Sequence, residues 1–506
     1  MLGASRKILK NTLLLTIGLY SGRFLALFLR QKMTPILDTE GIGIWTFALS
    51  ITGIMQTISN FGLGNLLTRE VSKARRLTRP LLWNTLKVRW LMAAVCYTFL
   101  LGFAWAEGWP VLDRTVVLLM ALAVFLEGAG LACDAVLQAH EKVQYQSLGQ
   151  IASAILYFAL GWWWLDAGYG IVGLVWANLA SRVIRLAVMV PFMVRHAGPW
   201  QRAEGDDVAA TSMRRLMVMG FPIFLATTFA TIYSQIDSVM LKNMMDNAAT
   251  GIYGQGRQAL NILVLVPALF GLAFFPSMAR YGQSSPRDAA RLGERALRFI
   301  LVAIVPLSFF IMFTARPIIM WFEKGSAAGT FLFADSVTVM RIGIWGLPMH
   351  AIAVVMNRLL LTAERERYFV VIGLVPMLAN IALNLFLIPR YSYYGAAVAT
   401  VLSLAVNVVM HLVFLRGTNF LPPLRRALLG PALAALASWG GVVLLGRLVV
   451  PDWGLGWLAL PLGRGWWAFL ATSFLMLGLY AVLLAVGRVV RADDLRLLKE
   501  LRQTPR

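Results

Sequence analysis

Three arginines lie well inside apolar segments, where a charged side chain is expensive. Arg23, Arg257 and Arg341 each fall within a run of about 20 mostly apolar residues, long enough to cross a membrane as a helix. An arginine near the centre of such a helix costs about 2.5–3.5 kcal/mol on insertion scales. Such side chains usually face a polar cavity or a partner, and several cations at similar depth attract a phosphate or pyrophosphate. We therefore expect these arginines to line an anion-binding cavity.

Further polar residues accompany these arginines at helical spacing, which would place them on the same helix faces. Tyr253, Arg257 and Asn261 recur every four residues. Arg30 follows Arg23 by about two helical turns. Arg182 lies somewhat nearer the end of its segment. The residues expected to bind substrate in the cavity are Arg23, Arg30, Arg182, Arg257, Arg341, Tyr253 and Asn261.

Other basic residues within the apolar segments have a simpler explanation. Lys87, Arg89, Arg185 and Arg358 lie within about two turns of a segment end, where long side chains reach the headgroups. We therefore expect these four side chains to snorkel, that is, to extend along the helix to the headgroups.

Two aspartates are candidates for ion coupling or gating. Asp237 lies at a depth similar to that of Arg257, so the two either pair or leave Asp237 for a coupling ion. Asp134 has Lys142 and Arg182 as potential partners, and a gating or packing ion pair is favoured there over an ion-coupling site.

The composition predicts the scaffold that must position these residues. Of 506 residues, 59% are hydrophobic and 14% charged, and the mean hydropathy is +0.71. These values are typical of an all-α polytopic membrane protein. We predict about 14 transmembrane helices, near residues 12–30, 42–66, 82–106, 115–139, 146–165, 170–194, 216–241, 250–279, 296–315, 332–361, 368–388, 394–415, 427–447 and 465–487.

The formal net charge is +22, and the distribution of the basic residues predicts how the chain is oriented in the membrane. Most lysines and arginines fall in the loops on the side of the N-terminus, which predicts that both termini are cytoplasmic. The basic residues at 287, 291, 295 and 298 share one helical face and suggest contact with anionic lipids. Because topology explains the charge, we do not expect nucleic-acid binding.

Similar stretches recur about 220 residues apart and in the same order, which indicates an internal repeat. Residues 134–145 resemble 357–368, 173–181 resemble 395–403, and 39–45 resemble 248–253. Two parallel six-helix bundles plus two further helices follow, an architecture typical of transporters. The predicted divisions are a first bundle at 1–195, a cytoplasmic linker at 196–215, a second bundle at 216–416, two extra helices at 427–487 and a basic cytoplasmic tail at 488–506.

Motifs for enzymatic chemistry are missing from the sequence. There is no Gly-x-x-x-x-Gly-Lys-Ser/Thr phosphate loop, and the four histidines are scattered. An integral glycosyltransferase would need an acidic metal motif at the membrane edge, which the sequence lacks. We therefore expect no enzyme activity, no cofactor and no metal site.

Several stretches together resemble a known family. They are Arg30 followed by 38–45, residues 60–64 followed by Arg69 and Glu70, and the stretches 232–241, 251–253 and 390–400. Their order is similar to that in bacterial O-antigen and exopolysaccharide flippases of the multidrug/oligosaccharidyl-lipid/polysaccharide (MOP) superfamily. The resemblance covers about residues 10–490.

The resemblance implies a flippase of the cytoplasmic (inner) membrane. It would move undecaprenyl-diphosphate-linked oligosaccharide units by alternating access, beside polysaccharide polymerases and glycosyltransferases. A lipid II flippase stays open as an alternative. So does a non-transporting scaffold of a polysaccharide-synthesis complex, which would not need the buried arginines. The basic interior argues against a multidrug extruder, which favours cationic drugs.

Overall fold

The computed structural model describes residues 2–196, 211–264, 285–324, 331–422, 429–438 and 478–484, with isolated positions at 266–268, 270, 278, 281 and 440. Side chains are described from residue 22 onward. By contacts the chain divides into two compact units, residues 1–254 with 322–332 and residues 255–321 with 333–505. The predicted linker at 196–215, most of 427–487 and the tail at 488–506 lie largely outside the described residues.

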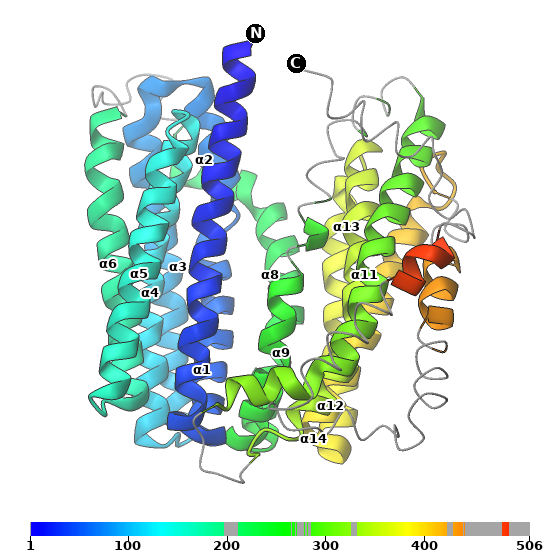
Figure 1. Cartoon of the computed structure of the whole chain (residues 1–506). Helices are drawn as coiled ribbons and strands as arrows, with labels where there is room; N and C mark the ends of the chain where they lie inside the picture. The colour runs from blue at the N-terminus through cyan, green and yellow to red at the C-terminus, as the bar shows by residue number, and fades with distance from the viewer. Residues whose placement is uncertain are drawn as a thin grey trace. The chain divides into compact units, whose positions relative to one another are not determined.

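The first unit is a bundle of long helices (Figure 1). α1 packs against α3, α4, α5 and α8, and α6 packs against α4 and α5. The short α2 lies against α3 and α4. The helices are α1 (Leu2–Asn60), α2 (Leu63–Lys73), α3 (Thr78–Ala106), α4 (Val111–Ala139), α5 (Val143–Asp166), α6 (Gly170–His196), α8 (Met213–Met244) and the first half of α9 (Asn247–Leu263).

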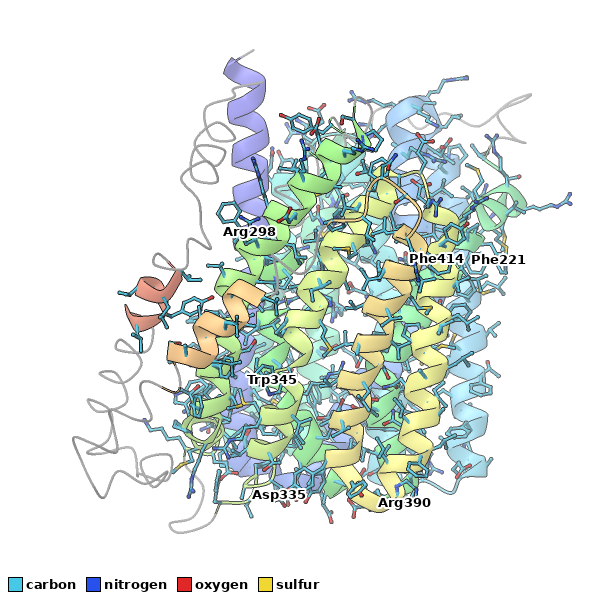
Figure 2. All side chains as sticks on the ribbon, turned by 90° about the vertical axis from the view of Figure 1, so that its right-hand side faces the viewer. Phe221, Arg298, Asp335, Trp345, Arg390 and Phe414 are labelled. Carbon is cyan, nitrogen blue, oxygen red and sulfur yellow. The ribbon has the colours of Figure 1, made fainter. Side chains whose placement is uncertain are left out.

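Among its described residues, the second unit contains the rest of α9, α11 (Pro286–Phe322), α12 (Ser336–Gly343), α13 (Gly346–Thr362), α14 (Phe369–Leu415) and a short helix at Leu429–Ser438. α14 packs against α12 and α13. Figure 2 labels Asp335 and Arg390 at one end of this unit and Arg298 nearer the other. The Tyr393 and Tyr394 hydroxyls donate to Asp335 over 2.7 and 2.8 Å and tie α14 to the start of α12.

The predicted fold class, an all-α polytopic membrane protein, is confirmed. Nine segments of the described chain are helices long and apolar enough to cross a membrane. Large apolar side chains on their outer faces, such as Phe99 and Phe386, are more than half exposed, as expected for contact with lipid. Two of the nine segments, 22–73 and 366–415, are about twice the length of one span and bend internally at Asp38 and Ser392.

The bend in α1 is a helix cap set by the sequence. Asp38 has φ 54°, and its carboxylate accepts hydrogen bonds from the backbone N–H groups of Glu40 and Gly41 at 2.9 and 3.1 Å. A new helix therefore starts at this residue. At the corresponding place in the repeat, Asp246 accepts from the backbone N–H of Ala249 at 2.6 Å and starts α9.

The segments that follow these two caps cross each other in the first unit. A Cβ atom on Gly43 would lie 1.8 Å from the carbonyl oxygen of Asn247, and one on Gly251 would lie 2.0 Å from that of Thr39. Only glycine permits such an approach of two backbones. The contacts are reciprocal, because Thr39 and Gly43 occupy the repeat positions of Asn247 and Gly251. Two-fold pseudosymmetry therefore closes this end of the bundle.

α8 belongs to the first unit by its contacts, whereas the repeat assigned it to the second bundle. It runs along the second half of α1, where Phe61 stacks on Phe224 with ring centroids 4.4 Å apart. Further along, the Thr57 and Thr231 hydroxyls lie 3.2 Å apart. The boundary between the two units falls within α9 by contacts. The division at 196–215 rests on sequence similarity between the copies and stays a prediction.

The basic residues at 287–298 share the first part of the 37-residue α11. Arg291 is exposed and pairs with Asp288 at 3.1 Å. Arg298 pairs with Glu294 at 2.8 Å, and its side chain is only 12% exposed. The face offered to lipid headgroups is therefore less basic than its sequence indicates.

Candidate functional site

A polar cavity of about 780 Å³ lies within the first unit. α1, α2, α4, α5 and α6 surround it, in the half of the bundle nearer the turn between α4 and α5. Five of its lining residues carry a guanidinium or a carboxylate group, and most of the others carry an amide or a hydroxyl group. The lining is Gly22, Arg23, Asn60, Gly64, Asn65, Thr68, Glu127, Leu131, Asp134, Ala135, Gln138, Gln146, Gln150, Ser153, Ala154, Tyr157, Asn178, Ser181, Arg182 and Arg185.

Three helices each present a polar stripe to the cavity. Stripe residues recur every three to four positions, so they share one face of each helix. The opposite face of α5 and α6 is apolar, and borders a surface groove lined by residues such as Leu156, Trp176 and Val183. The stripes are Glu127, Asp134 and Gln138 on α4, Gln146, Gln150, Ser153 and Tyr157 on α5, and Asn178, Ser181, Arg182 and Arg185 on α6.

Four of the lining residues form an ion-pair chain between α4 and α6. Glu127 Oε2 lies 2.5 Å from Arg182 Nη1, and Glu127 Oε1 lies 2.7 Å from Arg185 Nη1. The other terminal nitrogen of Arg185 lies 2.5 Å from Asp134 Oδ2. All but Arg182 are at least nine-tenths buried. Such a chain is costly in an apolar bundle unless each charge is compensated.

Two expectations of snorkelling are therefore wrong. Arg185 is 6% exposed and holds two carboxylates, so it is the partner of Asp134 in place of the expected Lys142 or Arg182. Arg89 is completely buried and donates to the carbonyl of Gly128 at 2.9 Å and to Asn60 Oδ1 at 2.6 Å. Both lie about three turns inside their helices, α3 starting at Thr78 and α6 ending at His196, and their partners hold them inside the bundle.

Of the other predicted residues in the first unit, some line the cavity and others are buried elsewhere. Arg23 is exposed and lines the cavity, together with Arg182 and Asp134. Arg30 is 5% exposed and buried in the bundle instead. Tyr253 is also buried, and its hydroxyl donates to Asp237 at 2.7 Å, so this pair joins α8 to α9.

Three predicted residues belong to the second unit. Arg257 is half-buried and Asn261 is exposed on α9. Arg341 on α12 is half-buried and donates from Nε to the carbonyl of Met312 on α11 at 3.2 Å.

Sequence reasoning missed Glu127, Arg185 and the polar face of α5. One signal could have found the first two. Glu127 and Asp134 are seven residues apart on one apolar helix, while Arg182 and Arg185 are three apart on another. Complementary charges at matching helical spacing in two apolar segments indicate paired faces.

The cavity is suited to binding a polar, anionic molecule. Three arginines and two carboxylates line it, so its formal balance is positive. Amides and hydroxyls supply both donors and acceptors, the groups that recognise sugar hydroxyls. Among the described residues, no group of three or more His, Cys, Asp or Glu side chains is placed to hold a metal ion.

Membrane-spanning bundles around a polar, charged cavity define a membrane transporter. Comparison with known proteins agrees. The chain belongs to the family described as polysaccharide biosynthesis protein, whose model matches residues 8–282. A second family model, MatE, matches residues 222–386. Together the two matches agree with the expected membership of the MOP superfamily of transporters and flippases. No curated protein sequence matches the chain.

Solved structures share the fold at low sequence identity. The lipid II flippase MurJ in an inward closed conformation is 15% identical, with a TM-score of 0.71 over 94% of this chain and 98% of MurJ. The MATE multidrug transporter DinF-BH is 15% identical, with a TM-score of 0.59 over 82% of this chain and 96% of that one. The Vibrio cholerae MATE transporter VcmN is 12% identical, with a TM-score of 0.56 over 82% and 98%.

Proposed function

We propose that this protein flips undecaprenyl-diphosphate-linked oligosaccharide units across the inner membrane by alternating access, for O-antigen, capsule or exopolysaccharide synthesis. The observation that carries the proposal is the polar cavity with Arg23, Arg182 and Arg185 inside an apolar bundle. Arginine is suited to diphosphate because its planar guanidinium offers several donors and stays charged. The family match, to polysaccharide biosynthesis proteins, supports a glycan as the other part of the substrate.

In the proposed cycle the head group enters the cavity while the lipid tail stays in the bilayer. The cavity lies in the half of the bundle away from the glycine crossing at Gly43 and Gly251, which supports a cycle in which the crossing is the closed end. With both termini in the cytoplasm, the closed end is periplasmic. Outward movement of a head with about two negative charges gains roughly 2.3 kcal/mol per charge per 100 mV of inside-negative potential.

The test is transport by the purified protein in proteoliposomes. The substrate is a short-chain polyprenyl-diphosphate oligosaccharide carrying a fluorophore, and the readout is its accessibility to a quencher on the far side. We expect Arg23→Ala and Arg182→Ala to slow transport at least about tenfold, the effect of losing a charge-assisted contact of about 1.5–3 kcal/mol. Arg291→Ala is the matched control, because Arg291 is exposed at the start of α11.

The same assay separates the alternatives. Wild-type transport of lipid II but not of the oligosaccharide-linked lipid would favour the lipid II flippase. Transport that survives loss of Arg23, Arg182 and Arg341 together would show that the cavity is not the route. A scaffold for polymerases and glycosyltransferases would transport neither lipid, and its function would tolerate all three substitutions.

A further inference from the structure

The carboxylate of Glu127 occupies the position that an anionic ligand would take in the cavity. Each of its oxygens contacts one guanidinium, Oε2 that of Arg182 and Oε1 that of Arg185, at 2.5 and 2.7 Å. A phosphate group binds two arginines in the same way, one oxygen to each. The site is therefore already filled by an anion that belongs to the chain.

The two arginines that share this carboxylate are not equivalent. The Arg185 side chain is 8% exposed and keeps a second carboxylate, Asp134, if Glu127 leaves. The Arg182 side chain is 32% exposed on the cavity wall. Among the described residues it forms an ion pair with Glu127, and its buried Nε has no hydrogen-bond partner there. Arg182 is thus the arginine that can change partners, and Arg185 is the one that stays anchored.

We propose that Glu127 is a resident counter-anion, exchanged at Arg182 for a phosphate group when substrate enters the cavity. The inference rests on the proposed function for the identity of the substrate, but the exchange itself requires only a phosphate-type anion. A diphosphate carries more charge than a carboxylate, so it displaces Glu127 from Arg182 while Arg23 adds further positive charge on the same wall.

The exchange gives the cavity two properties that a transporter needs. In the unloaded state Glu127 compensates two arginines that are expensive in an apolar bundle. In the loaded state it competes with the ligand, so binding is weakened enough for release. Permanently free arginines would hold a diphosphate too tightly to let it go.

The direct test is binding of inorganic pyrophosphate to the full-length protein in nanodiscs, measured by calorimetry. Glu127→Gln keeps the size of the side chain and one acceptor oxygen but removes the competing charge. We expect the variant to bind pyrophosphate at least about tenfold more tightly than wild type. Glu70→Gln is the matched control, because Glu70 also lies between two cations, Arg69 and Lys73, but outside the cavity. It should bind as wild type does.

A second variant distinguishes the loss of charge at position 127 from a folding defect. Glu127→Asp keeps the charge but shortens the reach, so its pyrophosphate affinity should lie between those of wild type and Glu127→Gln. Unchanged or weaker binding in both variants, with melting temperatures like that of wild type, would overturn the proposal and make Glu127 a purely structural bridge.

Transport of the polyprenyl-diphosphate oligosaccharide provides a separate readout. Glu127→Gln should bind this lipid more tightly and yet move it several-fold more slowly, because release becomes limiting. If Glu127→Gln tightens pyrophosphate binding but wild type does not transport the lipid, the counter-anion stands and the proposed function fails. If wild type transports the lipid but Glu127→Gln does not tighten binding of either probe, the counter-anion fails and the proposed function stands.

Discussion

The two copies of the internal repeat share helices but differ in charge. The first copy carries the ion-pair chain that lines the cavity, and at the corresponding positions of the second copy every charge is replaced. There, the side chain of Asn407 donates to the carbonyl of Ile372 at 3.2 Å. The fold therefore forms with or without the network, as expected if buried ion pairs are weak contributors to stability. The corresponding pairs are Glu127 and His350, Asp134 and Asn357, Arg182 and Leu404, and Arg185 and Asn407.

The crossing of the two capped segments, in contrast, is alike in both copies. The helix caps Asp38 and Asp246, and the glycines that follow them, are the same in both copies. They form the crossing in which each glycine meets the backbone of the other segment. Backbone geometry that closes a bundle end is thus duplicated, whereas the chemistry of the cavity belongs to one copy.

Removal of the central cation should cost the most stability. Arg185→Ala leaves Asp134 without its arginine and Glu127 with one of two, and uncompensated buried charge costs about 3–5 kcal/mol. We expect a large fall in the melting temperature of the detergent-solubilised protein, measured by intrinsic fluorescence. A melting temperature within error of wild type would show that the network is hydrated and dispensable for folding.

Disruption of the glycine crossing should have the next largest effect. Gly251→Val places a side chain 2.0 Å from the carbonyl of Thr39, an overpacking worth about 1–3 kcal/mol. A cysteine at Thr57, after replacement of Cys96 and Cys133, should then react several-fold faster with a polar thiol reagent. Gly102→Val is the control, because a Cβ there meets nothing within 4 Å. Equal labelling in both variants would contradict a sealing role.

The second-copy counterpart of Arg185 should matter much less. Asn407→Ala removes one hydrogen bond, to Ile372, and should lower the free energy of unfolding by about 0.5–1.5 kcal/mol. The same melting experiment measures it. A loss as large as that of Arg185→Ala would mean that the two copies depend equally on these positions.

Exchange of the whole network for its counterpart should cost less stability than Arg185→Ala and should affect transport most. The fourfold variant combines Glu127→His, Asp134→Asn, Arg182→Leu and Arg185→Asn. Because the two carboxylates are removed together with the two arginines that pair with them, its melting temperature should fall by less than that of Arg185→Ala alone. Transport in proteoliposomes should be lost, and activity retained by this variant would remove the network from the mechanism.

Part of the site could be predicted from the sequence. Arg23, Arg182 and Asp134 were expected to be functional because a charge within an apolar run is conspicuous, and the cavity contains all three. Glu127 was missed because the sequence does not show which residues of a neighbouring helix a single carboxylate pairs with. Arg89 and Arg185 were misjudged for a related reason, since distance from a helix end does not say whether a face is turned to lipid or to protein.

The amino-acid sequence by itself determined that this protein is a helical membrane protein with an internal repeat and buried basic residues. Those properties depend on the length of apolar runs and on local helical spacing, which require no knowledge of the neighbours. Only the tertiary structure decided that α4 and α6 face each other and that Glu127 bridges two arginines. Helix rotation and packing set those contacts, and a turn of about 100° per residue lets one step along the chain move a side chain from lipid to cavity.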